Sequence, residues 1–203
     1  MTGNYMKISI ESHLLREGIN KILTVIDKKN SRPILTNCLI NALDGKLELI
    51  ATDLEVTAKV IIRANVDNSG SFCINTKNIS DILRELPDDT IEMVIDHGKN
   101  VLNLDCKNIN YSLLITSSDD YPQVSFENSS QPINLKSKDI LNIINKTTHA
   151  ISTDETRVNL NGVYFQQLDT KLRAVAIDGH RLALLDLNNF SSTNQVLQDG
   201  VIL

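Results

Sequence analysis

Three stretches of the chain share one pattern, in which a short alternating run is followed by apolar residues at helical spacing. The alternation at residues 7–11, 71–75 and 133–136 predicts strands, because successive side chains of a strand point to opposite faces. The residues behind each run predict a helix, with Ser12, Thr76 and Ser137 as expected N-caps. The apolar helix positions are Leu15, Ile19, Ile22 and Leu23, then Ile79, Ile82, Leu83 and Leu86, then Ile140, Leu141, Ile143 and Ile144.

After each helix the chain alternates again, as antiparallel strands do. Residues 44–45, 97–100 and 169–170 carry the Asp, Gly and Asn residues of hairpin turns. Residues 119–131 are polar, contain Pro122 and have the composition of a linker. The pattern predicts an α+β protein in which each helix buries one face on a sheet and leaves the opposite face available.

The sequence repeats itself at a constant offset of 125 residues. Residues 7–62 align with residues 132–187 without a gap, including Arg32 with Arg157 and Asp53 with Asp178. A weaker offset of 64 relates residues 10–12 to residues 74–76 and conserves pattern more than identity. The repeat predicts one full unit at residues 6–125, a linker at 126–131, and a second, unfinished unit at 132–203.

The length of 203 residues corresponds to about 1.6 repeat units. By the same offset, the second helix of the second unit is expected near residue 201. Residues 200–203 nevertheless read as the strand before that helix.

Charge changes the picture only when it is divided by region. The net charge is −5, which excludes a uniformly basic nucleic-acid binder. The predicted helices (residues 12–29, 77–86 and 136–147) hold nine basic and five acidic residues, so the rest of the chain is strongly acidic. Such a basic layer is either an ordinary solvated face or a surface that faces phosphate. Aromatic residues make up only 4%, too few for a base-stacking surface.

Candidate chemistry is sparse. Cys38, Cys73 and Cys106 lie in apolar, strand-like runs and are expected to be buried, reduced thiols of a cytosolic protein. No apolar run is long enough for a membrane span, and residues 1–13 lack an apolar signal core. Asp53 and Asp178 occupy equivalent positions, which suits either paired catalytic carboxylates or, more commonly, Asp at a strand–strand turn. No phosphate-binding loop or nucleophile motif is present.

Several segments, in one order along the chain, resemble the bacterial DNA polymerase III beta subunit, the sliding-clamp family. Residues 176–183 (AIDGHRLA) resemble its T-D-G-H-R-L-A segment. Further similar segments are residues 6–8 (MKI), 32–35 (RPIL), 51–55 (ATDLE), 118–122 (SDDYP) and 160–162 (LNG).

The resemblance implies a DNA-clamp fold: repeated βαβββ halves, with antiparallel sheets forming an outer wall and helices lining a DNA-facing inner surface. It implies a homodimeric ring around double-stranded DNA when the chain is full length, with three domains per chain. The implied partners are the catalytic subunit of DNA polymerase III, in a holoenzyme that includes a 3′–5′ exonuclease, the clamp loader, and other polymerases and repair proteins. It implies a cytoplasmic protein with no catalytic residues, no cofactor, no metal and no membrane association.

The resemblance also carries two sets of residues. The partner-peptide groove takes Leu160, Ile177, Gly179, His180, Arg181 and Leu182. Without the resemblance, the apolar members of this set read as core. The expected DNA-facing residues are Lys29, Lys77, Arg16, Lys21, Lys138, Lys146 and Arg157. Asp154, Glu155, Val158 and Asn159 depart from the polar or basic residues that the family carries in the loop around Arg157.

Two alternatives from other classes stay open at this point. One is a duplicated acid-dependent hydrolase that uses Asp53 and Asp178, which requires the two carboxylates to meet. The other is an interaction scaffold unrelated to DNA. On the clamp interpretation the chain is truncated, because it lacks the rest of the groove and the third domain.

Overall fold

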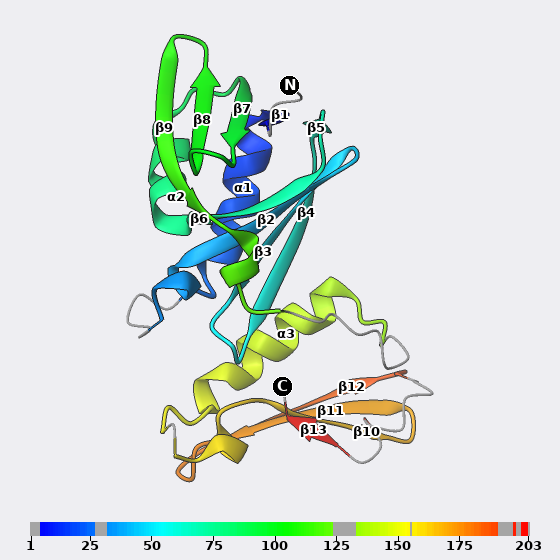
Figure 1. Cartoon of the computed structure of the whole chain (residues 1–203). Coiled ribbons are helices and arrows are strands. Elements are labelled where there is room, and N and C mark those ends of the chain that lie inside the picture. Colours follow the sequence, from blue (N-terminus) through cyan, green and yellow to red (C-terminus); the bar gives the residue numbers. More distant parts are fainter. Residues whose placement is uncertain are drawn as a thin grey trace. The chain divides into compact units, whose positions relative to one another are not determined.

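The computed structural model divides into two compact units, residues Met1–Ser125 and Phe126–Leu203 (Figure 1). It describes residues 5–26, 32–123, 133–154, 156–190, 197 and 200–202. The expected linker at 126–131 and the expected DNA-facing Lys29 lie outside the described residues.

The first unit contains two βαβββ halves. The first half comprises β1 (Tyr5–Glu11), α1 (Ser12–Leu23), the 3-10 turn η1 (Pro33–Thr36), β2 (Asn37–Leu43), β3 (Lys46–Thr52), β4 (Thr57–Arg63) and β5 (Asn65–Val66). The second half comprises β6 (Gly70–Asn75), α2 (Thr76–Glu85), β7 (Thr90–Asp96), β8 (Val101–Cys106), β9 (Ile109–Thr116) and η2 (Ser118–Asp120). Helices beside antiparallel sheets confirm the predicted α+β class, and the three predicted hairpin turns are present.

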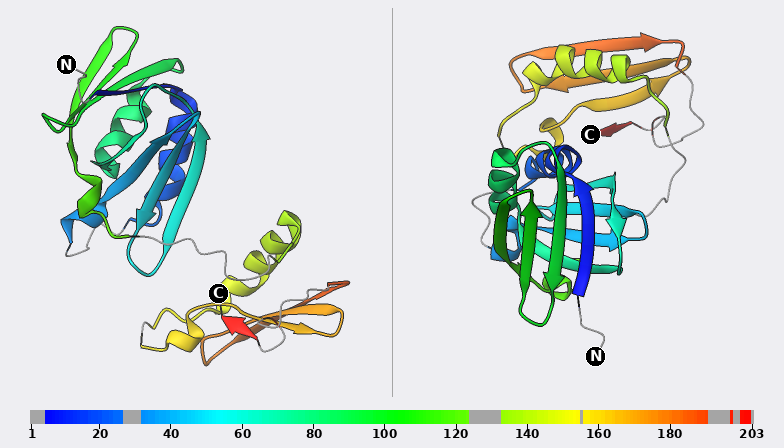
Figure 2. Two further views of the ribbon diagram at one scale, coloured as in Figure 1. Left: turned by 45° about the vertical axis from the view of Figure 1, so that its right-hand side comes forward. Right: turned by 90° about the horizontal axis from the view of Figure 1, so that it is seen from above.

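The two halves exchange their first strands. β1 pairs with β7 over seven residues, from Tyr5 opposite Asp96 to Glu11 opposite Thr90, and β6 pairs in the same way with β2. The resulting nine-stranded sheet has the order β4-β3-β2-β6-β9-β8-β7-β1-β5. Because β5 follows β4 after one residue and pairs with β1, the sheet curves around α1 and α2 (Figures 1 and 2). Each half therefore completes the other.

The helical spacing places one face of each helix of this unit in the core. Leu15, Ile19 and Ile22 of α1 are fully buried, as are Ile79 and Leu83 of α2. The three cysteines are buried and free, as predicted. Burial raises the pKa of the Cys38 thiol to about 12.

The N-cap prediction was wrong by one residue, because Ser12, Thr76 and Ser137 are the first residues of their helices. Asn75 caps α2 instead, its side chain accepting a hydrogen bond from the backbone N–H of Asn78 at 3.0 Å. The Ser12 hydroxyl is used across the fold, since it donates to the carbonyl of Pro87 and accepts from the N–H of Asp89. The Ser12 hydroxyl therefore bonds to the segment after α2 instead of capping its own helix.

The second unit reproduces the first half of the first unit. It comprises α3 (Ser137–Thr147), the 3-10 turns η3 (Thr148–Ala150) and η4 (Val158–Leu160), β10 (Tyr164–Leu168), β11 (Lys171–Ile177), β12 (Leu182–Asn188) and β13 (Val201–Ile202). The starts of α3, η4, β11 and β12 each lie 125 residues after those of α1, η1, β3 and β4. In Figure 2, α3 lies across one face of the β10–β12 sheet.

The predicted strand at residues 133–136 is wrong, because the structure assigns no strand there. Its equivalent, β1, is held by a full ladder with β7. Among the described residues of the second unit, the strands pair only in the order β12-β11-β10-β13, and none of them pairs with residues 133–136. An alternating run without a partner strand has nowhere to form its ladder.

Residues 201–202 form β13, which confirms the strand predicted at residues 200–203, whereas the offset of 125 was wrong in placing the start of a helix near residue 201. Tyr164 of β10 pairs with Ile202, whereas its equivalent, Leu39, pairs with Cys73. The offset is therefore 129 at this strand rather than 125. Four additional residues between β12 and β13 therefore move this strand along the chain.

Candidate functional site

The predicted groove residues centre on the tight turn between β11 and β12. Ile177 and Leu182 form the last pair of that hairpin, and the turn between them is held by Asp178. The Asp178 carboxylate accepts from the backbone N–H groups of His180 and Arg181, at 2.9 and 3.0 Å, and from Nε of Arg181 at 2.8 Å. These hydrogen bonds, those of the backbone first, lower the pKa of Asp178 to about 2. The turn is thus a preorganised structure that carries its negative charge at neutral pH.

Gly179 suits the backbone of this turn. Its φ of +93° lies in the left-handed region, which side-chain-bearing residues rarely adopt. A Cβ atom at this position would lie 3.3 Å from Nη1 of Arg157. The guanidinium of Arg157 therefore lies against residues 178–181, the turn between β11 and β12 that we call the groove turn. Its Nε also pairs with Asp154 at 3.3 Å. Sequence reasoning assigned Arg157 to DNA and missed this contact, which no spacing in the sequence signals.

Leu160 comes from the loop that carries Arg157. It is half-buried at the end of η4, and its carbonyl accepts from the N–H of Ser152 at 2.9 Å. Ile177 and Leu182 are 38% and 59% exposed. None of these three side chains belongs to the buried core, so interpreting them as core residues does not explain them.

The same turn occurs in the first unit without the same side chains. Asp53 accepts from the N–H groups of Glu55 and Val56 at 2.9 and 2.6 Å, and Leu54 has a φ of +83°. Asp53 and Asp178 thus have the same structural role, each closing the turn of its own unit. This favours the turn interpretation over the paired-carboxylate one.

The predicted DNA-facing residues differ in what they contact. Lys21, Lys77, Lys138 and Lys146 are exposed on α1, α2 and α3. Arg16 instead closes the carboxyl end of α2, donating from Nε to the carbonyl of Leu83 and from Nη2 to that of Leu86, at 2.8 and 2.9 Å. Its Nη1 pairs with Asp88 at 2.9 Å. The helix lysines are therefore better placed than Arg16 to meet a phosphate.

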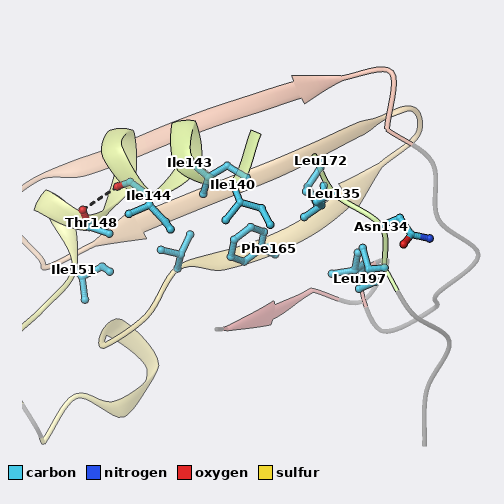
Figure 3. Close-up of a pocket in the computed structure, with 12 residues that line it drawn as sticks. Asn134, Leu135, Ile140, Ile143, Ile144, Thr148, Ile151, Phe165, Leu172 and Leu197 are labelled. Atoms are coloured by element: carbon cyan, nitrogen blue, oxygen red, sulfur yellow. Dashed lines mark hydrogen bonds between the residues drawn. The ribbon is translucent and has the colours of Figure 1, made fainter. Parts of the chain in front are cut away.

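The second unit contains an apolar cavity of about 620 Å³, which sequence reasoning missed. Figure 3 shows the residues that line it. Ile140 and Ile144 of α3 face Phe165 of β10 across it, and Leu135 and Leu172 line one end. None of the predicted groove residues lines this cavity. The repeat offset could have revealed it, because the lining corresponds to core positions of the first unit.

Two kinds of feature are absent from the described residues. The helices in this part of the chain are all too short or too polar to span a membrane. No group of three or more His, Cys, Asp and Glu side chains within it converges as metal ligands would.

Comparison with known proteins assigns both units. Residues 6–125 match the N-terminal domain of the DNA polymerase III beta subunit, and residues 134–203 match its central domain. The chain is 31% identical over 198 residues to the beta sliding clamp of Rickettsia felis, covering 98% of this chain and 51% of the relative. It is 33% identical over 196 residues to that of Caulobacter vibrioides, covering 90% and 50%.

Solved structures give the same result. The DNA polymerase sliding clamp from Caulobacter crescentus superposes with a TM-score of 0.89 at 32% identity, covering 98% of this chain and 54% of that one. A sliding clamp from Bartonella birtlesii, solved with griselimycin bound, gives 0.88 at 29% identity, with 98% and 54% covered. The chain spans about half the length of the curated relatives that it matches. These matches and the clamp fold of its two units show that the chain belongs to the DNA polymerase III beta subunit family.

Proposed function

We propose that the chain acts as part of a sliding clamp that encircles duplex DNA and tethers the replicative polymerase for processive synthesis. The observation that carries this proposal is the order of the two units, which match the N-terminal and central domains of the family in succession. On this basis residues 6–125 are domain I, 126–131 the linker and 132–203 the first part of domain II. The clamp itself performs no chemistry, and a role in replication would place it in the cytoplasm.

The DNA contact we propose is electrostatic and independent of sequence. Exposed lysines on α1, α2 and α3 suit this role, because an ammonium on a flexible stem attracts phosphate without reading a base. Loose contacts of this kind permit sliding, whereas base readout would hold the protein at one site.

Salt dependence tests the DNA contact. The logarithm of the association constant of a DNA duplex for the 203-residue chain should fall linearly with the logarithm of the salt concentration. Each of Lys77→Glu and Lys146→Glu should make that slope shallower by about 1. Lys171→Glu, on the first residue of β11, is the matched control and should leave the slope unchanged. Equal effects of all three changes would show that the helices are not the DNA-facing surface.

The groove turn is our proposed docking site for a short hydrophobic peptide of the polymerase, the clamp loader and other replication or repair proteins. Ile177 and Leu182 supply adjacent exposed apolar surface, and Leu160 adds to it from the neighbouring loop. Gly179 permits close approach of a peptide backbone, while His180 and Arg181 offer polar contacts at the rim.

Paired substitutions test this groove. Leu160→Ala and Arg181→Ala should each weaken binding of a Leu- and Phe-containing peptide to the full chain by about tenfold. Leu54→Ala, in the equivalent turn of the first unit, should have no effect. Unchanged affinity in both groove variants would refute the assignment.

A further inference from the structure

The loop between η3 and β10 brings Leu160 to the candidate groove. We call its residues 152–154 and 156–160 the Arg157 loop. Among these described residues the one regular element is the three-residue turn η4. The same loop places Arg157 against Gly179 of the groove turn. Because no α-helix or sheet ladder runs through these residues, side chains must help to hold the loop in this position.

Asn161, which follows the loop, faces three of its backbone carbonyls. The amide nitrogen of its side chain, Nδ2, lies 3.2 Å from the carbonyl oxygen of Ser152, 3.0 Å from that of Asp154 and 3.2 Å from that of Arg157. Of the two ends of this amide, only the nitrogen can donate to a carbonyl, so the three acceptors fix the orientation of the side chain. One side chain thus joins the beginning of the loop to its middle.

Other hydrogen bonds hold parts of the same loop. The N–H of Ser152 donates to the carbonyl of Leu160 at 2.9 Å, and the Asp154 carboxylate accepts from the N–H of Thr156 at 3.0 Å. The Asn161 amide adds a connection between these two parts. Asn161 is exposed and does not belong to the buried apolar cluster of the second unit, so changing it breaks hydrogen bonds without opening a cavity in the core.

We propose that Asn161 is a positioning residue of the peptide groove. Its amide joins three carbonyls of the Arg157 loop and so sets the position of Leu160 beside the groove turn. A loop that is held before binding loses less conformational freedom when a peptide arrives. The inference deepens the proposed function and rests on it, because it assigns part of the affinity of the groove to a residue that acts through this loop rather than through the peptide.

The first unit holds the equivalent loop with a different side chain. Position 161 corresponds to Thr36, whose hydroxyl donates to the carbonyl of Pro33 at 2.8 Å. Thr36 thus donates to one loop carbonyl, where the amide of Asn161 faces three. The repeat therefore supplies a substitution that keeps one donor, Asn161→Thr, and a matched site in the unit without the predicted groove residues.

Three variants of the full chain separate hydrogen bonding from side-chain shape. Asn161→Asp keeps the shape but turns an oxygen towards three carbonyls, so it should weaken binding of an uncharged peptide containing Leu and Phe by about tenfold. Asn161→Thr changes the shape but keeps one donor, and the loss should be about threefold or less. Thr36→Val is the matched control and should leave the affinity unchanged. Full affinity in Asn161→Asp, or a larger loss in Asn161→Thr than in Asn161→Asp, would overturn the inference.

NMR spectra of the same chains without peptide distinguish failure of this inference from failure of the proposed function. Asn161→Asp should shift the backbone N–H signals of Arg157, Leu160 and Gly179 and leave those of the first unit in place. Loop signals that do not move would overturn the inference, whatever the peptide does. If they move but the unchanged chain binds no peptide, the proposed groove is refuted and the role of Asn161 in it falls as well.

Discussion

Gly18 of α1 and Leu49 of β3 show how the two units fill the same space between helix and sheet with different residues. A Cβ on Gly18 would lie 2.7 Å from Cδ1 of Leu49, so the side chain of β3 fills the space that α1 leaves. In the second unit the equivalent positions hold Ile143 and Ala174, both buried. The large residue is on the sheet in one unit and on the helix in the other, which conserves the volume between them.

Gly18→Ala is therefore expected to destabilise the first unit by about 1–3 kcal/mol, because overpacking outweighs the better helix propensity of Ala. Chemical denaturation measures this change. Adding Leu49→Ala should make the double variant less destabilised than the sum of the single changes. Simple additivity would show that the two side chains do not share this space.

The Asp178 turn should respond to acid. Its folded pKa of about 2 lies below the ordinary 3.8, so its contribution to stability is present above pH 4 and is lost as the pH falls towards 2. An NMR titration of the carboxyl group should find this low midpoint, and Asp178→Asn should remove that part of the pH dependence of the second unit. A midpoint at or above 3.8 would contradict the hydrogen bonding described for the turn.

Helices and turns that depend on their own residues were predicted correctly from the sequence, whereas elements that depend on distant partners were not. The apolar spacing located α1, α2 and α3, and the Asp, Gly and Asn residues located the hairpin turns at residues 44–45, 97–100 and 169–170, because both signals reside in the element itself. The strand expected at residues 133–136 failed because a strand also needs a partner, which the alternating pattern does not reveal. Ser12 failed as a cap because its hydroxyl is used by Pro87 and Asp89, more than seventy residues away.

Within the candidate site, the same limit applies. The turn from Ile177 to Leu182 is contiguous in sequence and was predicted as one feature. The contact of Arg157 with Gly179 depends on how a separate loop folds back, and the role of Arg16 depends on the position of α2. Neither residue type nor spacing distinguishes a cation that closes a helix from one that faces phosphate.

Arg16→Leu, the residue of the equivalent position 141, separates these two roles. Loss of two carbonyl partners at the carboxyl end of α2 should destabilise the first unit by about 2 kcal/mol. Thermal unfolding measures this loss, while the salt slope of DNA binding should stay close to that of the unchanged chain. A stable variant with a reduced slope would assign Arg16 to DNA instead.

For the two units together, the difference between their buried apolar clusters has a thermodynamic consequence. Calorimetry should resolve two transitions, with the second unit unfolding first because its described core buries fewer apolar side chains than that of the first unit. Leu47→Ala and Leu172→Ala are matched changes at equivalent, fully buried positions of β3 and β11. Each should cost about 2–5 kcal/mol, the first lowering only the upper transition and the second only the lower. A single transition shifted by both changes would show that the units unfold as one.

The clamp assignment depends most directly on whether the turn between β11 and β12 receives a partner peptide. The decisive measurement is an NMR titration of the isotope-labelled 203-residue chain with a short peptide containing Leu and Phe. We predict chemical-shift changes that centre on Leu160 and residues 177–182, vanish in Leu182→Ala, and persist in Leu54→Ala. Equal changes at the Asp53 turn, or no response of residues 177–182 to millimolar peptide, would contradict the proposed groove.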